Sequence, residues 1–228
     1  MSAADACEVA AAVSGVDGAW ATVMSDPARR ALVHATGAKA AELDGLQFTL
    51  GEGPGLDAFA TGIPVLVPEL GTTGWQARWP AFVVAGVAAG AGAVFAFPLA
   101  SGAIRVGILG LYRDTPGSLS PGALADTLVC ADLTLQLLLN SRAAADGDGD
   151  GIGHIHDGWA PDGRPDDHAR VYQATGMVSA QRGVGLEAAL ALLRAYAFAH
   201  DQALGEVAAA VVDRRLRLDN DGFVDPAN

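Results

Sequence analysis

One segment near the middle of the chain decides how the rest can fold. Residues 146–167 begin Asp-Gly-Asp-Gly-Asp-Gly and continue with further glycine and proline and no apolar period. Such breaker-rich sequence is typical of a linker. Strand and helix patterns are mixed before it, whereas the pattern after it is helical. The sequence therefore predicts a mixed domain at 1–145, an acidic linker at 146–167, a helical domain at 168–218 and an acidic tail at 219–228.

Charge divides along the same segments. The chain has 14 Lys and Arg against 26 Asp and Glu, and this net charge of −12 argues against a nucleic-acid partner. However, the linker holds seven acidic residues and one Arg, and the tail holds three Asp, whereas 168–218 has six Arg and four acidic residues. The composition therefore excludes a protein that is basic all over, and it leaves a mildly basic C-terminal domain.

The N-terminal part alternates between helix and strand patterns. Val9 and Val13, four positions apart, predict a short helix over 3–14. Alternating apolar residues and turn signals predict the elements that follow. These are strands at 19–24 and 30–36, a glycine-rich bend at 51–55, a helix at 56–61, a strand at 63–67, a helical stretch at 75–89 broken near Pro80, and strands at 93–99 and 104–112.

Helices dominate the rest of the chain. Ser120 before Pro121 is a typical helix start, and the helix is predicted to run to about residue 145. Its apolar face carries Leu124, Leu128, Leu135 and Leu138. Beyond the linker we expect helices at 167–181, 186–200 and 204–216, the first two separated by a turn at 183–185. Three short helices bury little surface alone, so this part is expected to pack on something or to dimerise.

Two features bear on compartment. Residues 81–104 carry no charge, but they are built from Ala and Gly and include Pro98, so a buried helix, a glycine turn and a strand are expected rather than a membrane span. Cys7 and Cys130 are far apart and without CxxC spacing, which favours two free thiols. No signal peptide is evident at the start of the sequence. We therefore expect a cytoplasmic protein.

The chain resembles two known families in order. Motifs in its first part resemble a bacterial GAF sensor domain: Gln47-Phe-Thr-Leu-Gly-Glu-Gly-Pro-Gly-Leu-Asp57, Pro64-Val-Leu-Val-Pro68, Arg78-Trp-Pro80, Ala93-Val-Phe-Ala-Phe-Pro-Leu99 and Gly107-Ile-Leu-Gly-Leu-Tyr112. Motifs in its last part resemble the ANTAR output domain: Val171-Tyr-Gln-Ala-Thr-Gly-Met-Val178, Glu187-Ala-Ala-Leu-Ala-Leu-Leu-Arg194 and Leu204-Gly-Glu-Val-Ala208. The whole is similar to the GAF and ANTAR antitermination regulators of actinobacteria.

The resemblance implies an α+β fold class. A GAF-type antiparallel sheet flanked by helices, with a pocket for a small ligand on one face, would be followed by a small all-α three-helix ANTAR domain. ANTAR domains bind paired RNA hairpins in leader transcripts and prevent termination there, usually as dimers. The implied partners are therefore an RNA hairpin, a small-molecule ligand and a second copy of the chain in a homodimer, with no cofactor.

Most residues on the ANTAR pattern are apolar and predict helix packing. They are Ala174, Gly176, Ala189, Leu193, Ala197, Leu204, Val207 and Ala208. Arg194 follows the core residue Leu193 and should point outward, where its guanidinium group can bind phosphate or stack on an RNA base. Further RNA contacts are expected from Arg170, Arg182, Arg214 and Arg215. Thr175 stands where many ANTAR domains have lysine, which removes one expected phosphate contact.

Four aromatic residues are candidate walls of the ligand pocket, with core packing as the alternative. They are Trp20, Trp75, Trp79 and Phe95. Gly55 stands where related GAF sequences often have cysteine, which removes thiol chemistry at that position. Gly51-x-Gly53-x-Gly55 lacks the Lys-Ser/Thr of a phosphate loop, so a tight bend is expected.

The linker contains two patterns that also occur at metal sites. Asp146, Asp148 and Asp150 match the opening of an EF-hand calcium loop, and His154 and His156 have a spacing that can chelate metal weakly. A solvated acidic linker is the favoured interpretation of both. Since no catalytic constellation occurs in a convincing context, we expect no catalytic residues and no metal site.

These observations favour a signal-responsive RNA-binding regulator that promotes transcription antitermination. The alternative is a GAF sensor or scaffold that acts through protein contacts, with the ANTAR-like end serving dimerisation only. A GAF-fold enzyme such as a sulfoxide reductase is disfavoured by the placement of the cysteines. The acidic linker beside the Arg-rich helices also suggests a hypothesis: the linker competes electrostatically with RNA for those helices.

Overall fold

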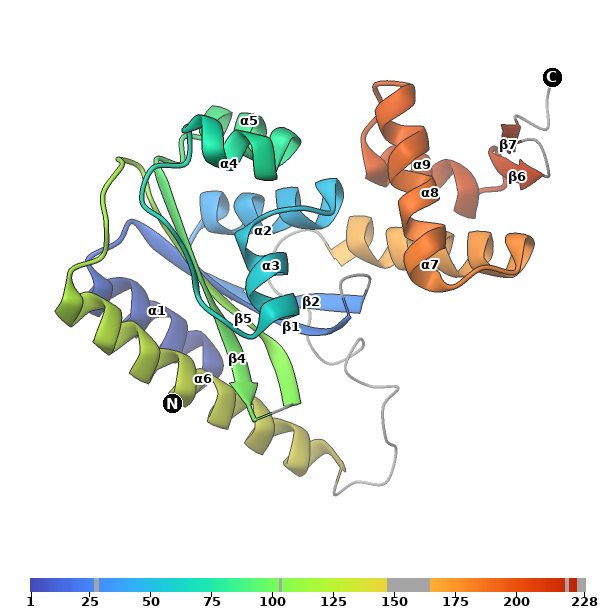
Figure 1. The fold of residues 1–228 in the computed structure, drawn as a ribbon. Helices are drawn as coiled ribbons and strands as arrows, with labels where there is room; N and C mark the ends of the chain where they lie inside the picture. The colour runs from blue at the N-terminus through green and yellow to red at the C-terminus, as the bar shows by residue number, and fades with distance from the viewer. Residues whose placement is uncertain (27–28, 103, 147–164, 220–221, 225–228) are drawn as a thin grey trace. The chain divides into compact units, whose positions relative to one another are not determined.

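The computed structural model describes residues 1–26, 29–102, 104–146, 165–219 and 222–224 (Figure 1). The chain forms two compact units, Met1–Ala160 and Pro161–Asn228. Most of the predicted EF-hand-like Asp run and the whole His154–His156 pair lie outside the described residues.

The first unit is built on one five-stranded antiparallel sheet. In space its strands lie in the order β2-β1-β5-β4-β3. The strands are β1 Gly18–Asp26, β2 Arg29–Ala35, β3 Val65–Val67, β4 Ala93–Ser101 and β5 Ile104–Arg113. All five were expected from the alternating pattern. The 81–104 stretch is divided between a helix and β4, as the glycine and proline positions predicted.

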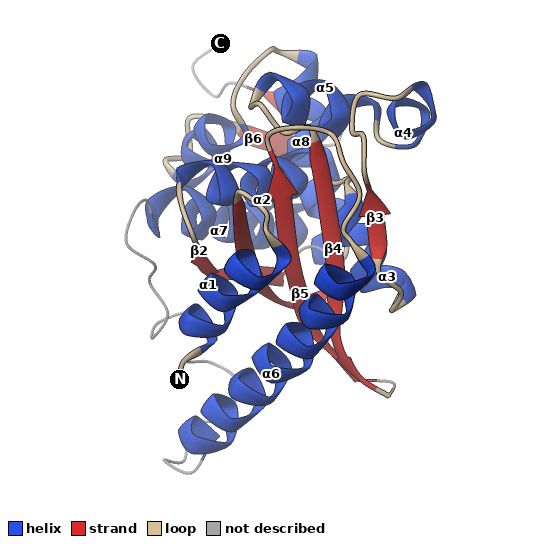
Figure 2. Ribbon diagram, turned by 90° about the vertical axis from the view of Figure 1, so that its left-hand side faces the viewer, coloured by secondary structure: helices blue, strands red, loops and turns tan. Residues whose placement is uncertain are grey.

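Helices cover both faces of this sheet. The helices α1 Ala3–Ser14 and α6 Pro121–Asp146 pack on one face, as Figure 2 shows, and they contact each other. On the other face lie α2 Ala38–Leu50, α3 Pro54–Thr61, α4 Thr73–Arg78 and α5 Pro80–Ala88. The helix α2 was not expected from the sequence.

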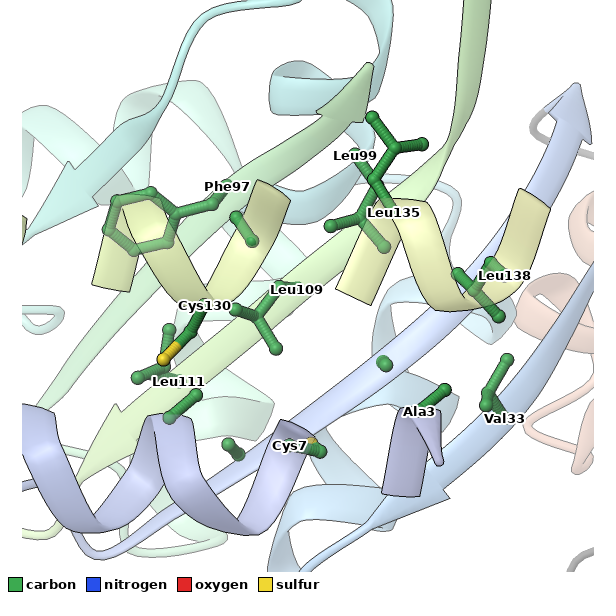
Figure 3. Packing of buried hydrophobic residues seen from close by; sticks show 14 of the residues in the cluster. Ala3, Cys7, Val33, Phe97, Leu99, Leu109, Leu111, Cys130, Leu135 and Leu138 are labelled. Atoms are coloured by element: carbon green, nitrogen blue, oxygen red, sulfur yellow. The ribbon is translucent and has the colours of Figure 1, made fainter. Parts of the chain in front are cut away.

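The two faces hold separate hydrophobic clusters. The α1/α6 cluster joins Cys7 and Cys130 to Phe97, Leu109 and Leu135 (Figure 3). The second cluster lies between the sheet and the helices α2–α5, and contains Trp20, Leu43, Phe59, Trp79, Phe82, Ile108 and Tyr112 among others. Successive strand residues point to opposite faces, so one strand can contribute to both clusters.

Two cross-strand pairs in this sheet place glycine under an aromatic ring. Trp20 pairs with Gly110, and a Cβ at Gly110 would overlap the Trp20 indole. Gly18 pairs with Tyr112, and a Cβ at Gly18 would lie 2.6 Å from the tyrosine ring. Any larger residue at either position would displace the ring that packs in the α2–α5 cluster.

The helix α6 begins as predicted, with Ser120 accepting a hydrogen bond from the backbone N–H of Ala123. Leu135 and Leu138 are buried, but Leu128 is 44% exposed and does not belong to the buried face. By length and composition α6 is apolar enough to cross a membrane over Pro121–Ser141. In the structure its apolar face packs against α1 and the sheet, as a core helix does.

The second unit consists of α7 Pro165–Arg182, α8 Leu186–Ala199 and α9 Leu204–Val212, followed by the hairpin β6 Arg217–Asp219 and β7 Gly222–Val224. All three helices were predicted. The third ends at Val212 rather than Leu216, because Arg214 adopts a left-handed conformation with φ of 60° and β6 starts soon after. The hairpin was not predicted, because its residues were assigned to the end of the helical domain and to an acidic tail beginning at 219.

Candidate functional site

A buried polar cluster lies on the α2 side of the sheet, where β1, β2 and α2 meet. The Asp44 carboxylate accepts a hydrogen bond of 2.8 Å from the Thr22 hydroxyl and forms an ion pair with Arg30. Arg30 also donates to the Asp44 backbone carbonyl at 2.8 Å, and its guanidinium group lies over the Phe48 ring. The side chains of Arg30 and Asp44 are only 4% and 1% exposed. Burying such a pair is costly unless it is fully hydrogen-bonded.

Two buried polar atoms on this side of the sheet have no hydrogen-bond partner among the described residues. They are Asp44 Oδ2, an acceptor, and Trp20 Nε1, a donor. Trp20 and Thr22 are two residues apart on β1 and so point to the same face. Since buried polar groups are nearly always paired, each orphan needs an explanation such as a bound polar molecule.

The glycine-rich bend folds around Gln47 of α2. The Gln47 side-chain oxygen accepts from the Gly55 N–H at 2.7 Å. A Cβ at Gly53 or Gly55 would lie within 2.8 Å of this side chain, and Gly53 has a φ of 137°. Glu52 in the same bend accepts from the N–H groups of Ala81 and Phe82, and so caps the start of α5. The bend therefore serves packing and capping, as its lack of a phosphate-loop lysine had indicated.

Three of the four predicted pocket residues share the α2–α5 cluster. Trp75 and Trp79 stack at 5.1 Å, and Trp79 donates from its indole N–H to Asp57 at 3.2 Å. Trp20 and Trp79 are buried, and Trp75 is half-buried beside them. Phe95 is different, because it packs in the α1/α6 cluster on the opposite face. Phe95 therefore cannot line one pocket with the tryptophans, since the sheet separates them.

Both thiols lie on the α1/α6 side and are buried. Burial raises the pKa of the Cys7 thiol to about 12 and also raises the pKa of Cys130. Because only the thiolate is a good nucleophile, these groups are poorly suited to covalent chemistry near neutral pH.

In the second unit the predicted RNA-contacting residues differ in exposure. Arg170, Arg182, Arg214 and Arg215 are exposed, whereas Arg194 is half-buried. Arg215 forms a surface ion pair with Asp213 at 3.1 Å. Arg182 ends α7, and Arg214 and Arg215 closely follow α9. The helix α7 contacts both α9 and β6, the two elements on either side of Arg214 and Arg215.

The remaining residues of the ANTAR pattern pack the three helices together. All except Gly176 are buried, as their apolar character predicted. Thr175 is also buried, at 3% exposure, and its hydroxyl donates to the Val171 carbonyl at 2.7 Å. The Thr175 side chain therefore faces the interior of the unit, and it does not belong to the exposed surface that carries the Arg residues.

Sequence reasoning missed one prominent side chain. Phe198, in the last turn of α8, is 86% exposed. The helical period could have shown this, because Phe198 lies off the face of α8 that carries Leu190, Leu193 and Ala197.

Comparison with known proteins fits these two units. Residues 163–212 match the model of the ANTAR domain family, over the helices α7–α9. Among solved structures, a domain assigned to a two-component sensor histidine kinase protein of Sinorhizobium meliloti 1021 is similar, with a TM-score of 0.51 and 14% identity, over 64% of this chain and 94% of that chain. The GAF domain of an Acinetobacter phosphoenolpyruvate-protein phosphotransferase has a TM-score of 0.48 and 13% identity, over 64% and 87%. No curated protein matches the chain in sequence.

The predicted fold class is therefore confirmed. The first unit has a GAF-like fold, and the second contains an ANTAR domain. The ANTAR family implies RNA binding and regulation by antitermination.

Proposed function

We propose that this protein is a signal-responsive regulator that binds an RNA hairpin in a leader transcript and promotes read-through of a terminator. The observation that carries the proposal is the ANTAR match over 163–212, which coincides with a packed three-helix unit. Residues 169–217 hold six Arg and four acidic residues, whereas the second unit from 165 to 224 holds six Arg and eight acidic residues. The individual Arg side chains, and not the net charge of the unit, would therefore contact the phosphates. A homodimer would double the number of these Arg side chains.

The GAF-like unit is proposed to sense a small ligand or a partner. The support is the buried cluster around Asp44, with two polar atoms, Asp44 Oδ2 and Trp20 Nε1, that a polar ligand can satisfy. The helix α6 would carry the response because it leads from the sensor into the linker sequence. A ligand can act in this way only if it binds two arrangements of the protein with different affinity.

A gel-shift titration with a two-hairpin RNA tests the RNA-binding part. Arg194→Ala is expected to weaken binding by about 1–3 kcal/mol if the guanidinium contacts a base, and Arg182→Ala to lower the salt dependence by about one counterion. Lys39→Ala, in the GAF-like unit, is the matched control and should change neither. Binding that ignores RNA sequence and both Arg substitutions would contradict the proposal.

A second candidate is a sensor or scaffold that acts through protein contacts. The observation in its favour is the outer surface of α1 and α6, where five large apolar side chains are exposed by more than 40%: Val9, Val13, Leu128, Val129 and Leu133. Sedimentation and gel-shift titration of the wild type and of Val129→Asp distinguish the two. If Val129→Asp loses self-association while RNA affinity per chain is kept, this surface serves assembly only and the first candidate holds. If the wild type self-associates and binds no hairpin RNA, the second candidate is favoured.

Location and chemistry complete the proposal. We place the protein in the cytoplasm, where leader transcripts are made and where its two thiols stay reduced. The buried thiols, with raised pKa, also support a regulator rather than a thiol-dependent enzyme.

A further inference from the structure

Phe198 is an aromatic side chain that the fold leaves in solvent. It is 86% exposed, and within residues 169–217 of the structure it is the one large apolar side chain on the surface. Other apolar residues of α8, such as Leu190 and Leu193, are buried in the three-helix unit, where α8 contacts α7 and α9. Phe198 therefore does not contribute to the packing of the three helices.

The surface beside Phe198 suits a flat group. Ala191 and Ala195 are exposed on the same side of α8. Their side chains end at Cβ, so no long side chain at these two positions covers the helix surface beside the ring. Arg194 is four residues before Phe198 and therefore its neighbour on the helix surface. Tyr196 lies on the other side of the helix, where its ring stacks on His200 at 3.9 Å.

We propose that Phe198 is the base-stacking residue of the RNA site, and that an unpaired base of the hairpin loop lies against its ring, next to Arg194. This inference rests on the RNA-binding function proposed above. Single-stranded bases stack on exposed aromatic rings and on guanidinium planes, and every base has a face that can do so. Phe198 would thus recognise an unpaired loop, whereas Arg182, Arg214 and Arg215 would contact phosphates.

An RNA base fits this surface better than a second protein. A phenylalanine side chain buries about 150–250 Å² at most. A stable protein interface needs about 800 Å² per partner, with several apolar side chains together. Here a single ring has Ala191, Ala195 and Arg194 before it on the helix and the exposed Asp201 after it. Residues 169–217 hold six Arg, which can contact the phosphates of RNA, against four acidic residues.

The test uses the full chain and a pool of two-hairpin RNAs with fixed stems and randomised loops. Binding is measured for the wild type, Phe198→Ala, Phe198→Leu and Phe198→Tyr. Base stacking predicts that Ala weakens binding by roughly 5- to 150-fold, that Leu is nearly as weak, and that Tyr stays close to the wild type. Because the side chain is exposed, all three variants should keep the wild-type helix content and unfolding midpoint.

Leu is the informative variant, because it keeps apolar bulk and lacks an aromatic face. If Leu binds the pool as well as Phe, or if Ala does, the stacking proposal is overturned. If Ala and Leu lower the sedimentation mass, the ring belongs to a protein interface and the proposal is again overturned. If the wild type retains no RNA from the pool, the proposed function itself fails, which separates the two conclusions.

Discussion

Asp44→Ala tests whether the buried polar cluster holds the GAF-like unit together. The substitution removes the acceptor of the Thr22 hydroxyl and the counter-charge of Arg30. The Arg30 side chain is 4% exposed, so water cannot replace the lost carboxylate without rearrangement of the unit. Breaking a buried ion pair by removing one partner costs about 3–5 kcal/mol. Since a domain is typically stable by only about 5–15 kcal/mol, this is a large part of the total.

The assay is a urea titration of the full chain, followed by tryptophan fluorescence, to which the fully buried Trp20 contributes. With a typical urea dependence of about 2 kcal/mol/M, the unfolding midpoint should fall by roughly 1.5–2.5 M. Asp114→Ala is the matched control. It breaks the Lys39–Asp114 pair at 2.8 Å, whose side chains are 31% and 52% exposed, and should cost less than about 1 kcal/mol.

A double variant checks the physical reason. Arg30→Met with Asp44→Leu removes both charges, so no unpaired charge is left in the interior, and stability should recover well above that of Asp44→Ala alone. The reasoning is refuted if Asp44→Ala costs no more than Asp114→Ala, because Arg30 would then be solvated or paired without Asp44.

Glycine, thiol and linker variants test other parts of the chain. Gly110→Ala should destabilise the first unit by about 1–3 kcal/mol, because the new Cβ would overlap the Trp20 indole. Gly45→Ala within α2 adds a Cβ in open space and should stabilise the unit by about 0.5–1 kcal/mol. Thermal unfolding measures both changes. Burial raises the pKa of the Cys7 thiol from 9.0 to about 12, so the contribution of the protonated thiol to stability is fully present below pH 9 and is lost as the pH rises towards 12. Maleimide should therefore label the thiols at pH 8 only after urea is added. Deleting 146–167 should strengthen RNA binding at low salt if the acidic linker competes with RNA; unchanged affinity in a gel-shift would contradict the hypothesis.

Local patterns were sufficient for most elements of this fold. Short apolar runs between turn signals identified all five sheet strands. The central strands β1, β4 and β5 are buried on both faces, so their apolar residues contribute to both clusters. Ser120 and Pro121 marked the start of α6 through a capping hydrogen bond that depends only on neighbouring residues. The third C-terminal helix was predicted too long, since its apolar spacing continues to Leu216 although the backbone turns at Arg214.

Residues brought together across the sequence could not be found in the same way. Asp44 and Gln47 looked like ordinary polar residues, and their roles exist only because α2 packs on β1 and the glycine bend. Phe95 was grouped with the tryptophans, but strand register places it on the other face. Likewise, helix packing decides that Thr175 is buried and that Leu128 is exposed.

The sequence by itself determined that there are two different parts, which elements most of each part contains, and which families they resemble, because these properties reside in local spacing and short motifs. Only the tertiary structure decided which polar groups are buried together and which side chains stay in solvent. Burial depends on contacts between residues distant in the chain, as for Thr22, Arg30 and Asp44 in one cluster and for Phe198 left outside another.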